Sequence, residues 1–128
     1  MILGRELLAQ AGDHLQRRVV TVPGFDGAVL VRELNDGQAS KVQKLAISAV
    51  RDGVVVDADR LAQMRSLMVF YAWIDGDGTP VLKQGEESEI ANLPRRLVDA
   101  MAEAIAELSG MKDAEGSQAS GSERAEKN

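Results

Sequence analysis

DADRLAQMRSLMVFYAWI, residues 57–74, contains three of the four aromatic residues in the sequence. Its apolar side chains recur at intervals of three and four residues, which places them along one face of a helix. They are Leu61, Met64, Leu67, Met68, Tyr71 and Ile74. Val69, Phe70 and Trp73 make the other faces apolar near the end, and a helix that is apolar all round is a buried helix. With Asp57 as a suitable N-cap, the stretch predicts the core helix of a small domain.

The segment before this helix has the pattern of a β-hairpin. Residues 18–22 and 28–34 are rich in β-branched side chains that alternate along the chain, as in half-buried strands. The inward-facing residues are Val29 and Val31, with Val20 and Val22 as candidates for the same face. The connection PGFDG, residues 23–27, supplies the proline, glycine and aspartate typical of turns. Two strands joined by five residues predict a hairpin.

Three further segments have the pattern of amphipathic helices. Residues 2–12 carry apolar side chains on one face and end at a glycine, but so short a helix is marginal without a partner. Residues 38–51 carry a second apolar stripe, with Asp36 as the expected N-cap. Pro94 suits the first position of the last helix, which Gly110 ends. The apolar stripe of that helix is Leu97, Val98, Met101, Ala104, Ile105 and Leu108.

The remaining segments are connections and a tail. Residues 52–56 are expected to be a short connection, residues 75–80 the turn of a second small hairpin, and residues 86–93 one or two helical turns. Residues 112–128 contain Gly, Ser, Ala and alternating charges, and such a composition predicts disorder. We therefore predict an α+β fold that is mostly helical, with one domain over residues 1–111 and a disordered tail.

Composition and charge exclude several classes of function. The absence of cysteine excludes disulfides and thiolate metal sites, and a single histidine excludes a histidine cluster. The net charge of −5, with its acidic excess in residues 57–128, argues against a nucleic-acid-binding surface. The core helix is too short, and with Arg60 and Arg65 too charged, to span a membrane, and no export signal is apparent. We predict no nucleic-acid partner and no membrane partner.

The sequence shows no recognisable catalytic set. DGDG at residues 75–78, followed by Glu86, resembles a calcium-binding loop, but Pro80 stands at the sixth position, where that loop requires glycine. A tight turn is the simpler interpretation. A solvated helix face explains the glutamates within residues 86–89, and no glycine-rich phosphate loop is present. We predict that the protein is not an enzyme and takes no cofactor or metal.

The hairpin also carries a family resemblance. VVTVPGFDGAVLVREL, residues 19–34, resembles the N-terminal hairpin of the short tail assembly chaperones of long, flexible-tailed bacteriophages, the siphophage tail assembly chaperone family. The residues that match the family pattern are Val20, Val22, Pro23, Gly27, Val29, Val31, Arg32, Glu33 and Leu34. The order of the later helices, an L-x-G at residues 108–110 and the Glu-Lys-Asn at residues 126–128 are also similar to that family.

This resemblance implies a non-enzymatic chaperone that binds the tape measure protein and helps to recruit tail tube subunits. It implies a homo-oligomer in the host cell cytoplasm that is absent from the mature virion. The tube protein would be bound mainly by a longer product of a programmed frameshift, for which a slippery run at the codons of residues 126–128 is expected. We expect the partner-binding anchors to be exposed apolar residues of the first and last helices, namely Leu7, Leu8, Met101 and Ile105.

Two other functions are compatible with the sequence. A structural tail or head-tail connector protein, retained in the virion, has no distinguishing motif here. A small-ligand binder would use the aromatic cluster of Phe70, Tyr71 and Trp73 as the floor of a cleft, although core packing also explains these residues. Because the first helix needs a surface to cover its apolar face, we also expect it to pack across a subunit boundary.

Overall fold

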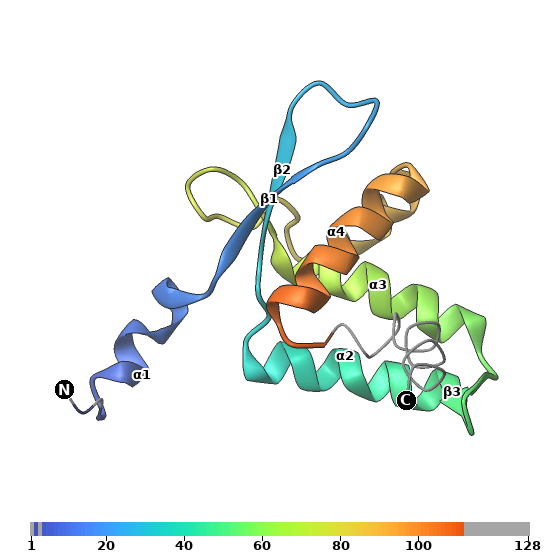
Figure 1. The fold of residues 1–128 in the computed structure, drawn as a ribbon, viewed down its shortest axis with the longest axis horizontal. Helices are drawn as coiled ribbons and strands as arrows, with labels where there is room; N and C mark the ends of the chain where they lie inside the picture. The colour runs from blue at the N-terminus through green and yellow to red at the C-terminus, as the bar shows by residue number, and fades with distance from the viewer. Residues whose placement is uncertain (1, 3, 112–128) are drawn as a thin grey trace, which may run out of the picture.

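The computed structural model describes residues 2 and 4–111, so the predicted tail at residues 112–128 lies outside the described part of the chain. The α+β class, mostly helical with an N-terminal hairpin, is confirmed (Figure 1). In chain order the elements are α1 (Leu7–Gln10), the 3₁₀ helix η1 (Ala11–His14), β1 (Arg17–Thr21), β2 (Ala28–Arg32), α2 (Asp36–Ala49), β3 (Val50–Arg51), β4 (Val54–Val55), α3 (Ala58–Ala72), β5 (Trp73–Ile74), the 3₁₀ helix η2 (Glu87–Asn92) and α4 (Arg95–Leu108).

The predicted core helix is α3, which packs against both α2 and α4 (Figure 1). Asp57 caps it as predicted, since its carboxylate accepts a hydrogen bond from the backbone N–H of Arg60 at 3.1 Å. Its buried residues are Met64, Met68, Val69 and Ala72. The helix ends two residues before the predicted stretch does, because Trp73 is extended and pairs with β2. Aromatic and β-branched side chains favour a strand where another strand offers its edge.

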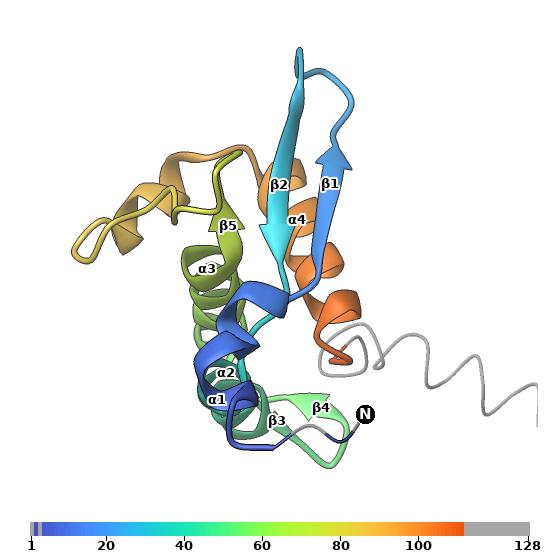
Figure 2. The same cartoon turned by 90° about the vertical axis from the view of Figure 1, so that its left-hand side faces the viewer.

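The predicted hairpin forms one side of a three-stranded antiparallel sheet in the order β1-β2-β5 (Figure 2). Val20 lies opposite Val29, and Arg18 lies opposite Val31. All four valines of the predicted face turn towards the hydrophobic core, where Val20, Val22 and Val31 are buried and Val29 is half-buried. α4 packs against β1 and β2 from this side. The predicted alternation of the strands is therefore confirmed.

α2 begins with a capping box at Asn35, one residue before the predicted cap. The side chain of Asn35 accepts a hydrogen bond from the N–H of Gln38 at 2.9 Å, and the side chain of Gln38 accepts one from the N–H of Asn35 at 3.1 Å. The prediction that Asp36 is the N-cap was wrong, because the extended residue before the first turn is Asn35. Asp36 lies in the first turn instead, where its negative charge complements the helix dipole.

The connection predicted at residues 52–56 contains a small antiparallel ribbon, β3–β4, in which Val50 lies opposite Val55. Asp52 and Gly53 form its turn with positive φ angles of 54° and 78°. An Asp-Gly pair between β-branched residues is a strong hairpin signal, so this element was predictable from its turn. The second small hairpin is confirmed only in part: Ile74 bridges to Pro80, and the N–H of Val81 donates to the carbonyl of Trp73 at 3.0 Å.

α4 ends at the predicted glycine in a Schellman motif. Gly110 has a φ of 70°, the left-handed conformation that glycine adopts without strain. The N–H of Met111 donates to the carbonyl of Ala106 at 2.7 Å, and the N–H of Gly110 donates to that of Glu107 at 3.2 Å. The turn brings Met111 back onto the core, where it is buried.

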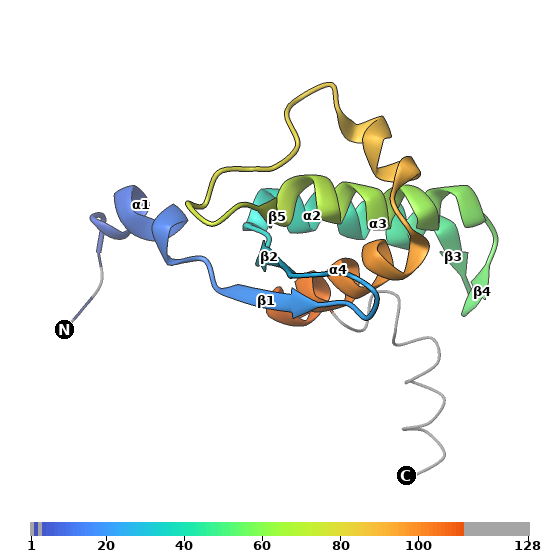
Figure 3. The same cartoon turned by 90° about the horizontal axis from the view of Figure 1, so that it is seen from above.

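The first helix is shorter than predicted. α1 covers only Leu7–Gln10 and continues as the 3₁₀ helix η1 to His14, so the predicted stop at Gly12 was wrong. α1 has no buried residue, and its main contacts are with η1. Figures 1 and 3 place α1 at one end of the molecule and the β3–β4 ribbon at the other. A helix of this length gains little stability on its own, which agrees with the short extent observed.

Candidate interaction surfaces

The acidic turn after β5 uses its carboxylates to hold its own backbone. A carboxylate oxygen of Asp75 accepts hydrogen bonds from the N–H groups of Asp77 at 3.2 Å and Thr79 at 3.3 Å. Asp77 in turn accepts one from the N–H of Thr79 at 2.9 Å. A hydrogen bond with the Asp75 side chain, together with those from Thr79, lowers the pKa of Asp77 to about 2. The carboxylates therefore act as turn-forming groups, as the simpler interpretation predicts.

The part of the chain that the structure describes brings together no group of three or more His, Asp or Glu residues able to hold a metal ion. Among the same residues, none of the helices has both the length and the apolar character needed to cross a bilayer.

The family-pattern segment at residues 31–34 packs within its own chain. Val31 of β2 is fully buried in the hydrophobic core. Arg32 donates a hydrogen bond from Nη2 to the carbonyl of Tyr71 at 3.3 Å, which ties β2 to the end of α3. The carboxylate of Glu33 accepts a hydrogen bond from the N–H of Gln16 at 2.8 Å, and the N–H of Glu33 donates to the carbonyl of Gln16 at 2.8 Å. These contacts hold the hairpin against the end of α3 and the residue that precedes β1.

Leu34 joins the hairpin to the other segment that carries the resemblance. Its side chain is buried, and its N–H donates to the hydroxyl oxygen of Ser109 at 2.8 Å. Ser109 lies in the L-x-G that ends α4, 75 residues further along the chain. The ion pair between Arg18 of β1 and Glu107 of α4 lies in the same region. The two matching motifs are therefore in direct contact.

The hairpin turn, with Pro23 and Gly27 of the family pattern, is held against α4 by Arg96. Nε of Arg96 donates to the carbonyl of Pro23 at 3.2 Å, and the guanidinium carbon lies 5.1 Å from the centre of the Phe25 ring, within the range of cation–π attraction. A Cβ on Gly24 would lie 3.0 Å from Nη2 of Arg96. The turn sequence therefore permits a close approach of arginine to the backbone.

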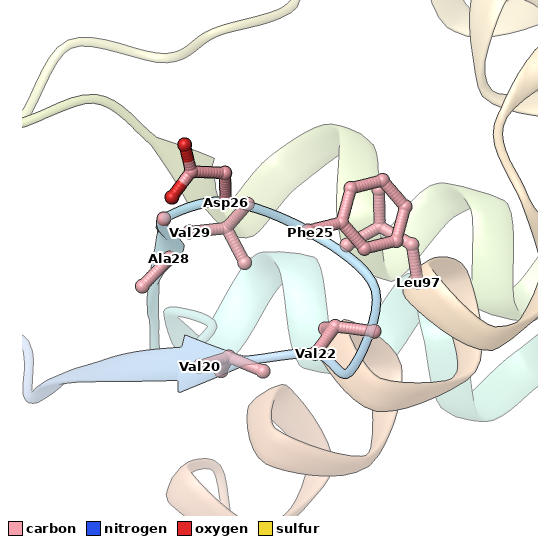
Figure 4. Close-up of a pocket in the computed structure, with 8 residues that line it drawn as sticks. Val20, Val22, Phe25, Asp26, Ala28, Val29 and Leu97 are labelled. Carbon is pink, nitrogen blue, oxygen red and sulfur yellow. The ribbon is translucent and has the colours of Figure 1, made fainter.

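A shallow groove of about 150 Å³ lies beside this turn (Figure 4). Its lining is largely apolar and comes from both strands, the turn and the first part of α4: Val20, Val22, Phe25, Asp26, Gly27, Ala28, Val29 and Leu97. Sites for drug-sized ligands are usually larger, about 300–1,000 Å³. The groove is smaller than this range.

Two of the four predicted anchors lie in the core. Met101 and Ile105 have no exposed surface, so the expectation that they are exposed was wrong. The apolar stripe of α4 covers α3 and the sheet and leaves these residues no free surface. Leu7 and Leu8 are exposed, at 40% and 75% of their surface, and they remain predicted anchors.

A second exposed apolar region, which was not predicted from the sequence, lies at the opposite end of the molecule. Ile47 of α2 is 74% exposed, and Val54, Val55 and Val56 of the ribbon are exposed as well. Ile47 falls outside the buried stripe of its helix, which consists of Val42, Ala46 and Ala49. The position of Ile47 off the buried stripe and the Asp-Gly turn of the ribbon are the sequence features from which this exposed region could have been predicted.

No protein-family model and no curated protein matches the sequence. Among solved structures, the chain is similar to one described as the structure of the bacteriophage HK97 tail assembly chaperone. The TM-score is 0.59 at 20% sequence identity, and the similarity covers 80% of this chain and 94% of that one. The expectation drawn from the hairpin pattern is thus confirmed at the level of structure: this chain has the fold of a bacteriophage tail assembly chaperone.

Proposed function

We propose that this protein is a tail assembly chaperone of a long-tailed bacteriophage, which binds the tape measure protein and helps to recruit tail tube subunits. The similarity of its fold to the HK97 chaperone is the observation that supports this proposal. Residues 1–111 act as one non-enzymatic domain that needs no cofactor. The protein works as a homo-oligomer in the host cell cytoplasm and leaves the tail before the virion is mature.

The proposed client-binding surface is α1. Leu7 and Leu8 are exposed on a helix that has no buried residue and lies apart from the core. A client with long apolar helices needs such a surface, because helix-to-helix recognition depends on apolar anchors. α1 is too short to be stable alone. We propose that the helix extends towards the predicted residues 2–12 when a client or another subunit covers it.

Co-expression with the tape measure protein from the same phage tests this function. We expect the chaperone to keep the tape measure protein in the soluble fraction and to co-purify with it. Leu8→Glu should reduce recovery at least about tenfold, because the loss of a hot-spot anchor costs about 2 kcal/mol or more and about 1.4 kcal/mol corresponds to tenfold in affinity. Val54→Glu is the matched control, an apolar-to-acidic change at the opposite end of the molecule, where the side chain is 61% exposed.

The same purification distinguishes the chaperone from a structural protein. Equal recovery with wild-type protein, Leu8→Glu and Val54→Glu would remove α1 as the client site. A tape measure protein that stays insoluble in all cases would count against the chaperone function itself. Detection of the chain in purified virions, at a constant ratio to the tube protein, would instead favour a tail or head-tail connector protein.

We propose that tube subunits are recruited mainly through a longer product made by a programmed frameshift. This part of the proposal is supported by the resemblance of the hairpin to the family. Expression of the gene with its native downstream sequence should yield a minor product that shares the described residues and continues into a second segment. Mass spectrometry should detect peptides that cross the junction, and their absence would contradict this route of recruitment.

A further inference from the structure

The outer edge of β1 has no neighbouring strand among the described residues. The sheet order is β1-β2-β5, so β2 occupies only one side of β1 (Figure 2). The N–H of Glu33 donates to the carbonyl of Gln16, which shows that the backbone groups of the even-numbered residues point towards β2. Because these directions alternate along a strand, the backbone groups of Arg17, Val19 and Thr21 point to the open edge.

The two arginines at the start of this edge each have a neighbour within the same chain. Edge strands commonly carry charged side chains that prevent pairing with another strand. Here Arg18 forms an ion pair with Glu107 of α4. The guanidinium of Arg17 lies against the turn after β5, since a Cβ on Gly78 would be 2.9 Å from its Nη2. From Val19 to Val22 the strand therefore carries β-branched, uncharged residues. Pro23, which has no backbone N–H, follows them.

The outer face of the sheet carries an apolar row that stops at this edge. Ile74 lies opposite Leu30, and Leu30 lies opposite Val19. Burial falls along the row: Ile74 is 1% exposed, Leu30 is intermediate and Val19 is 66% exposed. Val19 therefore has a cross-strand neighbour in β2 but none on the open side of β1, and such neighbours stabilise strand pairs.

We propose that β1 pairs with β1 of a second copy of this chain, antiparallel and about a two-fold axis at Val19. In this register Val19 meets Val19 of the other copy, and the apolar row continues without a break across a sheet of six strands, twice the three observed in one chain. Arg17 lies opposite Thr21 and Arg18 opposite Val20, so no like charges face each other. This symmetry makes a second copy a better occupant than an unrelated extended peptide.

The proposed pairing also determines where α1 would lie relative to the other copy. In an antiparallel pair, the start of β1 in one copy lies beside the end of β1 in the other. α1 and η1 lead directly into β1, so they are carried to the 23–27 turn of the other copy. Phe25 of that turn is 39% exposed beside the shallow groove. The pairing thus brings α1 towards the turn of the other copy and extends the homo-oligomer included in the proposed function.

Two sets of variants test this pairing in the purified full chain. Sedimentation of the wild-type protein gives the dissociation constant of the self-association. Val19→Lys should raise that constant at least about tenfold, because it places like charges opposite each other, and an equimolar mixture with Val19→Glu should restore association. Ile47→Lys, at another exposed apolar position, is the matched control and should leave the constant unchanged. The thermal midpoint of each variant checks that it is folded.

Cross-linking provides a second readout, since the chain has no cysteine. Because the backbone groups of Val19 point to the open edge, the two copies of Val19 would form a hydrogen-bonded pair. The Cα atoms of such a pair lie about 5.5 Å apart, within the range of disulfides. Val19→Cys should therefore form a disulfide-linked dimer far faster than Val54→Cys does. If the wild type associates but neither the charges nor the cysteine at position 19 has an effect, the edge pairing is overturned and the homo-oligomer stands. A wild type that is monomeric at every concentration overturns both.

Discussion

Replacing Met101 by alanine is expected to lower the free energy of unfolding by about 2–5 kcal/mol. Met101 lies in α4 with no exposed surface, within the cluster that joins α3, α4 and the hairpin. The change removes apolar contacts and leaves a cavity that the surrounding side chains fill only in part. Urea unfolding followed by circular dichroism measures the effect, with the slope of the transition as a check that unfolding stays two-state.

Leu8→Ala is the matched control for this change. Leu8 is 75% exposed, so the same kind of truncation should alter the free energy of unfolding by no more than about 0.5 kcal/mol. Binding to the tape measure protein should show the opposite order, with the larger loss in Leu8→Ala once both proteins are folded. A Met101→Ala variant of unchanged stability that loses client binding would return Met101 to the list of anchors.

Gly110→Val is expected to cost about 1–3 kcal/mol, the usual range for a residue held in an unfavourable backbone region. The φ of 70° at this position suits glycine and is strained for a β-branched residue. A shifted turn would also weaken the hydrogen bond from Met111 to Ala106 and withdraw a buried side chain from the core. The thermal midpoint should fall by several degrees, since 1 kcal/mol corresponds to roughly 4–8 °C in a chain of up to about 100 ordered residues.

Gly76→Val provides the comparison for this prediction. A Cβ added at Gly76 meets no atom within 4 Å, and its φ lies outside the left-handed region. The midpoint of that variant should therefore stay within about 2 °C of the wild type. Equal midpoints for the two variants would show that the Schellman turn contributes little to stability.

The long elements of the fold were predictable because their apolar periodicity is strong. The stripe within residues 57–74 identified the central helix, and the alternating valines identified the hairpin with its buried face. The errors lie where local patterns compete with tertiary contacts. Trp73 and Ile74 continue the apolar pattern of the helix, yet they pair with the edge of β2 and form a strand. Asn35 and Asp36 are equally good caps by composition, and backbone geometry decides between them.

The interaction surfaces were harder to predict than the fold. An amphipathic pattern marks an apolar face but does not say whether the chain itself or another molecule covers that face. For α4 the chain itself covers the face and buries Met101 and Ile105, whereas Leu7 and Leu8 of α1 stay exposed. The family pattern was found by its sequence, but its residues 31–34 serve the packing of the hairpin. Strand order, which leaves β1 at an edge, depends on long-range pairing.

The contact between Leu34 and Ser109 has a consequence for the order of events on the ribosome. The hairpin is synthesised early, but α4, which covers it, is made much later, and Ser109, which anchors Leu34, emerges 75 residues after Leu34. At about 5–20 residues per second this interval lasts roughly 4–15 s, during which the inner valines of the nascent chain lack their cover. Once Met111 has emerged, all residues of the described core have been synthesised. The core can therefore fold before any polypeptide that follows it has been translated.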